Sequence, residues 1–335
     1  MSEPKAGFVW RDADRTVLFR GGALADAPGL LAEHGFGEIE LLSTERALDG
    51  APALAAAAAT VHHVPAGPVP EAAASILPTV RSARLVALGG GRVIDSAKAI
   101  AAVTGAGVAA LPTTLSGAEM TAIHRLPAGE EGHPLIRPAL VIADPDAMTS
   151  QPEPALRASA MNALAHGADS LYTPFANPVS EMTALRGAGL IATALDSDRE
   201  QRNSTGLALG SVLCGYAIDS ALFALHHVVC QTLVRVLGTP HAETNAAILP
   251  HAMEAMRSRA PRQLGALAEA IGSDETGLGQ RIAELGGRPS GLRDLGAAAE
   301  RVDDALDTIL ARPELGFTPD PPGREELRRL IESAW

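Results

Sequence analysis

The chain has 335 residues, of which 47% are hydrophobic and 20% charged, so it can build two domains with buried cores. Its net charge of −12 opposes association with a polyanion, which excludes electrostatic nucleic-acid binding as the main function. The two cysteines, Cys214 and Cys230, exclude a framework of several disulfides. The N-terminus lacks the apolar stretch of a secretory signal, and the longest apolar run, residues 206–218, is too short to span a bilayer. We therefore expect a cytoplasmic, enzyme-sized protein without a membrane partner.

Up to about residue 146, short apolar runs alternate with longer amphipathic segments. Six of these runs predict β-strands, at residues 16–19, 39–43, 60–64, 84–88, 108–111 and 139–143. Strands that alternate with helices predict right-handed crossovers and a mostly parallel sheet with helices on both faces. Ligands of such sheets bind beyond the carboxyl ends of the strands. The pattern therefore predicts a Rossmann-like α/β domain over residues 1–150.

Beyond residue 150 the pattern changes to long helical segments separated by proline and glycine, without a convincing strand. The apolar run at residues 206–218 predicts a helix that is buried on all sides. We therefore predict an all-helical second domain over residues 151–335, which would bind the substrate.

The sharpest local signal follows the strand predicted at residues 84–88. Three consecutive glycines lead from this strand into a predicted helix: Gly89, Gly90 and Gly91. Glycines let the backbone approach a ligand closely, and the free N–H groups of a helix N-terminus suit a phosphate. Within the next two turns, Lys98 is placed to reach the ribose and nicotinamide side of a dinucleotide, and Asp95 to orient Lys98. The alternative is a tight strand-to-helix turn with no ligand.

The strand predicted at residues 108–111 ends in the same manner. Three hydroxyl side chains that suit a phosphate or ribose follow it: Thr113, Thr114 and Ser116. Two such loops at adjacent strand ends predict a dinucleotide cleft. The second predicted strand is followed by Thr44, at a place where an acidic residue commonly binds the adenosine ribose and excludes a 2′-phosphate. Because no carboxylate appears before Glu45, both NADH and NADPH remain possible cofactors.

Histidines recur in the second half of the chain at spacings that favour a shared site. Asn162 and His166 are four residues apart, as are His227 and Gln231, and such pairs share one face of a helix. His241 lies on a third segment. A lone buried histidine is more often a hydrogen-bonded core residue than a ligand, but three imidazoles from three segments can converge on one site.

Four motifs, in this order and spacing, resemble the iron-containing (group III) alcohol dehydrogenases: GGGRVIDSAKAI, ALPTTLSGAEMT, MNALAHGADSLY, and HHVVCQ followed by GTPHAETNAAILPHAM. The resemblance runs nearly end to end and is closest to the maleylacetate reductases. It implies the two-domain architecture shared with dehydroquinate synthase, a homodimer, and a site between the domains. It also implies hydride transfer from NADH or NADPH to a small carboxylated oxo or enol substrate. In maleylacetate reductases that substrate is a ring-cleavage product of aromatic catabolism, and the product is 3-oxoadipate.

This chain departs from the family's metal site. Metal-binding members resemble it in having histidines at His166, His227 and His241, but they carry an aspartate where Asn162 stands. A neutral amide weakens charge neutralisation of Fe²⁺, so we predict no catalytic metal; if one were bound, the three histidines would hold it. The histidines are instead expected, in protonated form, to bind the anionic oxygens of the substrate or to polarise its carbonyl. Tyr172 or a histidine is expected to supply the proton.

A second departure concerns proton transfer. Four residues after His227 the family usually has another histidine, and here Gln231 cannot titrate near pH 7. The serine that usually follows the three glycines is Arg92. Three interpretations follow: a metal-independent reductase, a homologue that kept the fold but became a non-redox enzyme or ligand-binding protein, and a metal-dependent alcohol dehydrogenase.

Overall fold

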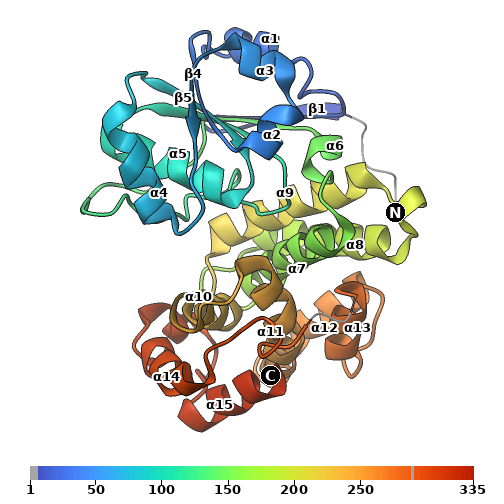
Figure 1. Ribbon diagram of the computed structural model, residues 1–335. Helices are drawn as coiled ribbons and strands as arrows, with labels where there is room; N and C mark the ends of the chain where they lie inside the picture. The colour runs from blue at the N-terminus through green and yellow to red at the C-terminus, as the bar shows by residue number, and fades with distance from the viewer. Residues whose placement is uncertain (1–6, 288–289) are drawn as a thin grey trace. The chain divides into compact units, whose positions relative to one another are not determined.

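The computed structural model describes residues 7–287 and 290–335, and the chain divides into two compact units, Met1–Gln151 and Pro152–Trp335. In the first unit, the described strands form one sheet in the order β1-β2-β7-β6-β5-β3-β4 (Figure 1). The strands are β1 (Gly7–Asp12), β2 (Arg15–Arg20), β3 (Ile39–Ser43), β4 (Ala58–His63), β5 (Arg84–Gly89), β6 (Gly107–Pro112) and β7 (Leu140–Ala143). All neighbouring strands are parallel except β1 and β2. The six predicted strands and the mostly parallel sheet are confirmed.

The seventh strand, β1, is absent from the sequence prediction. Its apolar run is short and passes directly into the charged segment that begins at Arg11. The strand forms through its antiparallel pairing with β2, in which Gly7 lies opposite Arg20. Because β1 is an edge strand, it leaves the carboxyl ends of the parallel strands unchanged.

Helices cover both faces of the sheet. They are α1 (Ala27–Glu33), α2 (Glu45–Asp49), α3 (Pro52–Ala57), α4 (Val69–Ile76), α5 (Gly91–Thr104) and α6 (Pro145–Met148). Successive side chains of a strand point to opposite faces. Leu85 and Ala87 of β5 accordingly pack in a buried cluster with α4 and α5, whereas Val86 and Leu88 pack with α1 and α3. The central strands β5, β6 and β7 are accordingly buried along nearly their whole length, as is typical of a parallel sheet covered on both sides.

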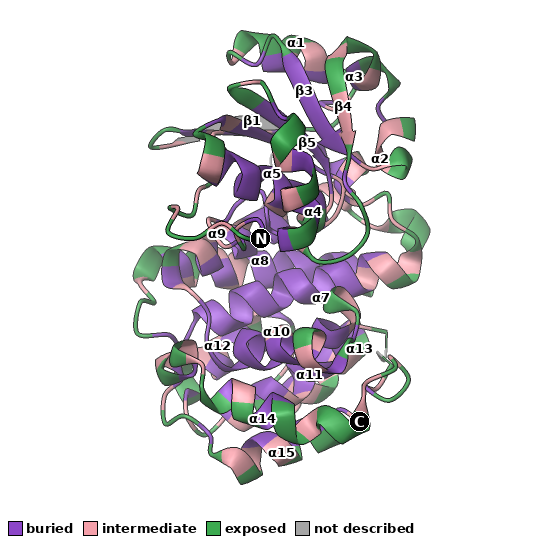
Figure 2. Cartoon of the chain, turned by 60° about the vertical axis from the view of Figure 1, so that its left-hand side comes forward, coloured by how far each residue is buried: buried purple, intermediate pink, exposed green. Residues whose placement is uncertain are grey.

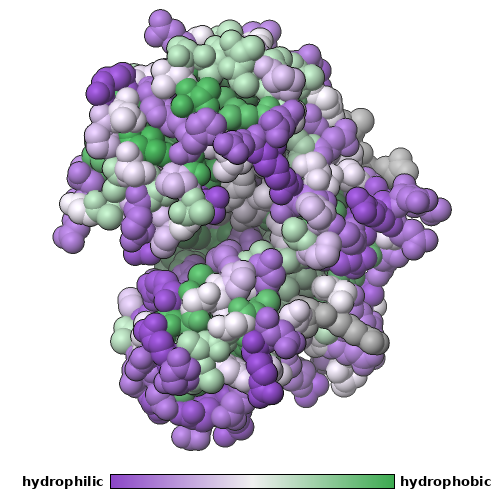
Figure 3. Space-filling view, in the orientation of Figure 1, coloured by the Kyte–Doolittle hydropathy of each residue, from purple (hydrophilic) through white to green (hydrophobic). Residues whose placement is uncertain are grey.

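The second unit is helical, and its described residues contain no strand. Its α-helices are α7 (Glu153–Ser170), α8 (Pro178–Asp196), α9 (Ser204–Ala221), α10 (Leu225–Leu237), α11 (His241–Met256), α12 (Pro261–Ala270), α13 (Leu278–Leu285), α14 (Val302–Leu310) and α15 (Arg324–Ser333). Figure 2 shows that β3 and most of α7 are buried. Hydrophilic residues dominate the lower part of the face in Figure 3, over α14 and α15, where Arg324 pairs with Asp303 and Asp307. The all-helical character predicted for this part of the chain is confirmed.

Small residues let α7, α8 and α9 pack closely. A Cβ atom added to Gly187 of α8 would lie 2.6 Å from the Cys214 sulfur and 2.8 Å from the carbonyl oxygen of Gly210, both on α9. Every residue in the predicted buried run 206–218 is buried or half-buried on α9. Among the described residues, no single helix meets the length and apolarity needed to cross a membrane, although α9 and α10, bent by 99° at their break, meet it as a pair.

Candidate active site

A cleft of about 390 Å³ lies in the first unit, at the carboxyl ends of β3, β5 and β6. Five of the predicted cofactor-binding residues line it: Thr44, Gly90, Gly91, Thr113 and Thr114. The other four do not belong to its lining: Gly89, Asp95, Lys98 and Ser116. The structure therefore brings the ends of three neighbouring strands together at one concave surface, which is where sheets of this kind bind ligands.

The glycines bring two loops into contact in this cleft. A Cβ atom added to Gly90 would lie 2.9 Å from the Thr114 methyl carbon, and one added to Gly91 would lie 3.1 Å from the Ser116 Cβ. Gly90 is also the N-cap of α5, and no side chain caps that helix. The Thr114 hydroxyl oxygen is buried, and no described residue forms a hydrogen bond with it. Backbone N–H groups and an unused hydroxyl fit the phosphates of a dinucleotide.

Lys98 is wholly buried, and all its ammonium protons are engaged. Its Nζ donates to the carbonyl oxygens of Ala118, Thr121 and Ile123, at 2.8, 3.0 and 3.2 Å. It also lies 2.8 Å from Asp95 Oδ1. Lys98 therefore holds the segment after β6 in place. Its contact with a dinucleotide stays a prediction, and it would require Lys98 to give up one of these hydrogen bonds for a bond to the ligand.

Glu119 lies in this same segment and is a feature that sequence reasoning missed. Its carboxyl group is fully buried, and neither oxygen has a hydrogen-bond partner among the residues that the structure describes. Burial raises the pKa of Glu119 from 4.5 to about 7, against smaller opposing contributions that include the charge of Lys98. An ionised carboxylate is costly in such surroundings.

We expect Glu119→Gln to remove a pH dependence of stability. The carboxyl group stabilises the fold fully below its unfolded pKa, and this contribution is lost as pH rises through about 7. The shift corresponds to a loss on the order of 3 kcal/mol. Denaturant unfolding of the variant and of wild type from pH 5 to 8 measures this loss of stability. Glu71→Gln is the control, because Glu71 is exposed. Parallel pH profiles for Glu119→Gln and wild type would contradict the assignment.

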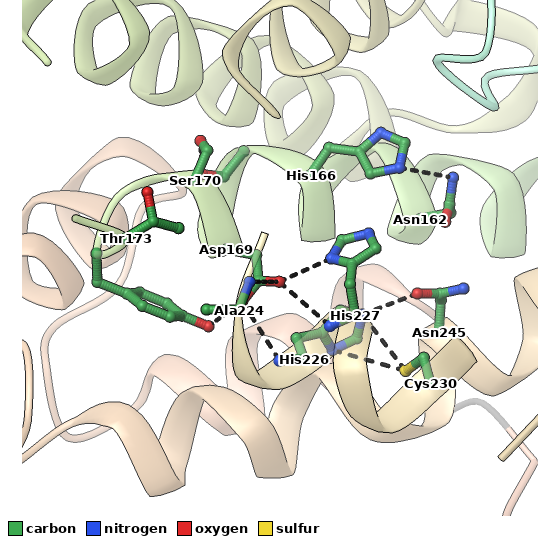
Figure 4. A network of polar contacts seen from close by, with 12 residues as sticks. Asn162, His166, Asp169, Ser170, Thr173, Ala224, His226, His227, Cys230 and Asn245 are labelled. Carbon is green, nitrogen blue, oxygen red and sulfur yellow. Dashed lines mark hydrogen bonds and ion pairs between the residues drawn. The ribbon is translucent and has the colours of Figure 1, made fainter. Parts of the chain in front are cut away.

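The predicted histidines come together in the second unit. Asn162 and His166 lie on α7, and His227 lies on α10 (Figure 4). The His166 and His227 rings stack with centroids 5.0 Å apart and an interplanar angle of 24°. Asn162 Nδ2 lies 3.5 Å from His166 Nε2. His241, the first residue of α11, is exposed, and its charge acts on His166.

Burial makes neutral imidazoles the resting forms in part of this cluster. Desolvation, followed by the charges of His227 and His241, lowers the pKa of His166 well below its usual value. Burial likewise lowers the pKa of His226 to about 3. His226 Nε2 donates to Asn245 Oδ1 at 2.9 Å, so His226 is a hydrogen-bonded core residue. The expectation of protonated imidazoles therefore does not describe His166 without a bound anion.

The central polar group of the cluster is Asp169, which sequence reasoning missed. Its carboxylate is fully buried and accepts hydrogen bonds from the backbone N–H groups of Ala224, His226 and His227 at the start of α10. It also accepts from His227 Nδ1 at 2.9 Å and from the hydroxyl of Tyr172. A carboxylate at a helix N-terminus is favoured by the helix dipole. Asp169 thus fastens α10 to α7.

These contacts decide the ionisation of the pair and the tautomer of His227. Although burial alone would raise it, the hydrogen bond from His227 and the nearby charges hold the pKa of Asp169 well below its usual value. An ionised carboxylate only accepts, so His227 must carry its proton on Nδ1. His227 Nε2 has no hydrogen-bond partner among the described residues. A histidine held in this way suits general acid and base chemistry at Nε2.

The two remaining candidates lie beside this pair. Tyr172 is buried, donates to Asp169, and has a pKa raised well above its usual value by burial and by the Asp169 charge. These contacts make the phenol a poor proton source. Gln231 is half-buried one turn after His227 on α10, and the described part of the chain gives it no hydrogen bond.

The donor atoms of this cluster do not fit an iron site as they are arranged. Among the described side chains, no group of three or more histidines, cysteines, aspartates or glutamates is placed to hold a metal ion. His227 Nδ1 is committed to Asp169, and His166 Nε2 faces Asn162. Three imidazoles and an amide also provide no anionic ligand for Fe²⁺.

A glycine-lined cleft on a parallel sheet and a histidine cluster in a helical unit define a class of two-unit dehydrogenases. Residues 157–335 match the model of the Fe-containing alcohol dehydrogenase family, C-terminal. Maleylacetate reductase 1 from Rhodococcus opacus is 33% identical, covering 100% of this chain and 98% of its own. The chain therefore belongs to the iron-containing alcohol dehydrogenase family and is an oxidoreductase, as the sequence resemblance predicts.

Solved structures agree with this assignment. Maleylacetate reductase from Agrobacterium tumefaciens superimposes with a TM-score of 0.85 at 31% identity, covering 100% of this chain and 99% of its own. An iron-containing alcohol dehydrogenase from Corynebacterium glutamicum gives a TM-score of 0.84 at 30% identity, with 95% and 94% coverage. The predicted fold class is confirmed.

Proposed function

We propose that the chain is a NAD(P)H-dependent reductase of maleylacetate that works without a catalytic metal. The observation that carries the proposal is the Asp169–His227 pair, which leaves Nε2 of His227 unpartnered beside the neutral ring of His166. Relatives at about one-third identity over the whole chain are maleylacetate reductases, which supports the substrate class. The glycine-lined cleft supports the dinucleotide.

The reduction of maleylacetate requires a hydride, a proton and groups that bind the substrate oxygens. The glycine and threonine residues of the cleft would hold a reduced dinucleotide, which would supply a hydride for the alkene carbon β to the ketone of maleylacetate. The electron pair moves to the ketone oxygen, and the α carbon takes up a proton to give 3-oxoadipate. His166 and His241 bind the anionic oxygens of the substrate, whose negative charge favours the imidazolium form.

His227 supplies the proton from Nε2, and Asp169 stabilises the imidazolium before the transfer. Asn162 orients His166, and Tyr172 holds Asp169. Gln231 is not required for proton transfer, because it cannot titrate near pH 7. The proposal of metal independence is supported by the donor set, since the proposed acid and the groups that bind the substrate oxygens are all protein side chains.

Consumption of NADH or NADPH by the full chain, after exhaustive dialysis against EDTA, tests the proposal. We expect oxidation of the cofactor on addition of maleylacetate, with one 3-oxoadipate formed for each cofactor consumed. Activity that appears only after Zn²⁺ or Fe²⁺ is restored would refute metal independence. A wild-type protein that is inactive on maleylacetate but active after Gln231→His would instead favour a homologue that has lost its redox chemistry.

A further inference from the structure

Two arginines with no role in the proposed binding of the dinucleotide phosphates line the cleft in the first unit. Arg46 lies on α2, just after β3, and Arg92 lies in the first turn of α5, just after the three glycines. Both side chains line the cleft, and its lining includes no aspartate or glutamate. The chain as a whole has a net charge of −12, so this excess of positive charge is a property of the cleft.

Both guanidinium groups are available to a ligand. Arg46 and Arg92 are exposed, and neither has a hydrogen bond, ion pair or ring contact among the described residues. By contrast, the exposed Arg20 of the same unit is paired with Asp26 at 2.6 Å. The planar fork of a free arginine matches two oxygens of a phosphate.

The arginines flank the place where such sheets read the adenosine ribose. β3 and β5 are parallel neighbours, with Ser43 opposite Leu88, so Thr44 follows its strand beside the glycine loop. A carboxylate at this place binds the ribose 2′-hydroxyl, whereas a nearby arginine accommodates a 2′-phosphate. Here Thr44 takes the place of the carboxylate, and Glu45 is exposed and lies outside the lining.

We propose that this cleft selects a dinucleotide with a 2′-phosphate, and therefore NADPH over NADH, with Arg46 and Arg92 as the partners of that phosphate. The inference rests on the proposed dinucleotide cleft and specifies its cofactor. Thr44 contributes by not repelling the phosphate. Because the discrimination is electrostatic between exposed groups, it weakens as ionic strength rises.

Calorimetric titration of the full chain with 2′,5′-ADP and with 5′-AMP isolates the 2′-phosphate from the nicotinamide and from turnover. We expect 2′,5′-ADP to bind roughly 10- to 100-fold more tightly, as charge-assisted hydrogen bonds predict. Arg46→Gln and Arg92→Gln should each weaken binding of 2′,5′-ADP and NADPH by about tenfold, and change NADH binding by less than about twofold. Arg125→Gln is the matched control, because Arg125 is exposed in the same unit and does not line the cleft.

Thr44→Asp tests the same inference in the opposite direction. The new carboxylate should weaken NADPH binding and leave NADH binding equal or tighter. Equal affinity of wild type for NADPH and NADH would overturn the inference. An equal loss of affinity for NADPH and NADH in the arginine variants would also overturn it, because the arginines would then bind the pyrophosphate that both cofactors share.

These outcomes separate the inference from the proposed function. A protein that prefers NADPH but does not reduce maleylacetate would refute the proposed substrate and leave the cofactor assignment standing. Reduction of maleylacetate with NADH preferred would refute the cofactor assignment alone. A protein that binds neither dinucleotide would overturn both.

Discussion

His227→Ala is expected to lower kcat for maleylacetate reduction by about 10²- to 10⁴-fold, which is the usual contribution of general acid catalysis. His227 is the histidine whose Nδ1 is held by a buried carboxylate and whose Nε2 is left without a partner among the described residues. Removing it deletes the proposed proton source. Steady-state kinetics with maleylacetate and the reduced cofactor measure the effect.

Gln231→Ala is the matched control for this variant, because Gln231 lies one turn later on the same helix. It should retain activity within about tenfold, since an amide loses only hydrogen bonding. Similar losses of kcat in both variants would show that the substitutions act by disturbing the packing of α10. A loss confined to Gln231→Ala would contradict the assignment of His227 as the proton source.

Asp169→Ala is expected to lower the free energy of unfolding by about 3 to 5 kcal/mol, because each buried donor left without an acceptor costs roughly 1 to 3 kcal/mol. The variant leaves three backbone N–H groups at the start of α10, together with His227 and Tyr172, without their acceptor. Denaturant unfolding measures the change. Asp294→Ala, at an exposed position of the same unit, should change stability by less than about 0.5 kcal/mol.

The pH dependence of this contribution follows from the lowered pKa of Asp169. A carboxyl group with a depressed pKa stabilises the fold above its unfolded pKa of about 3.9, and the contribution is lost as pH falls below that value. The difference in stability between wild type and Asp169→Ala should therefore shrink in acid. A difference that stays constant down to pH 2, or a fully stable variant, would show that Asp169 does not hold α10.

The central strands β5, β6 and β7 were predictable because each is a nearly continuous apolar run, as a sheet covered on both faces requires. Residues 39–43 and 84–88 coincide with β3 and β5 to within one residue. β1 was not predictable by this signal, because an edge strand that pairs on one side needs no long apolar run. The glycine loop was predictable because close backbone approach restricts the choice of residue: a Cβ atom at Gly90 would lie only 2.9 Å from the Thr114 methyl carbon.

The site was predictable only where its members share a helix face. Asn162 and His166 are four residues apart, and Asp169 follows three residues later on the same helix face, so a polar stripe along α7 was the signal that would have revealed the carboxylate. Its role was not predictable, because it depends on the start of α10 packing against α7. The burial of Lys98 was not predictable for the same reason, because it depends on the carbonyl groups of Thr121 and Ile123, which lie more than 20 residues further along the chain.

Reduction of maleylacetate with NADPH or NADH deuterated at the transferable position of the nicotinamide tests the central claim most directly. In a single turnover by the EDTA-dialysed chain, mass spectrometry of the product should find one deuterium per molecule of 3-oxoadipate, at the carbon that was β to the ketone. Wild-type product without deuterium, or deuterium that appears only after Fe²⁺ or Zn²⁺ is added, would contradict metal-independent hydride transfer.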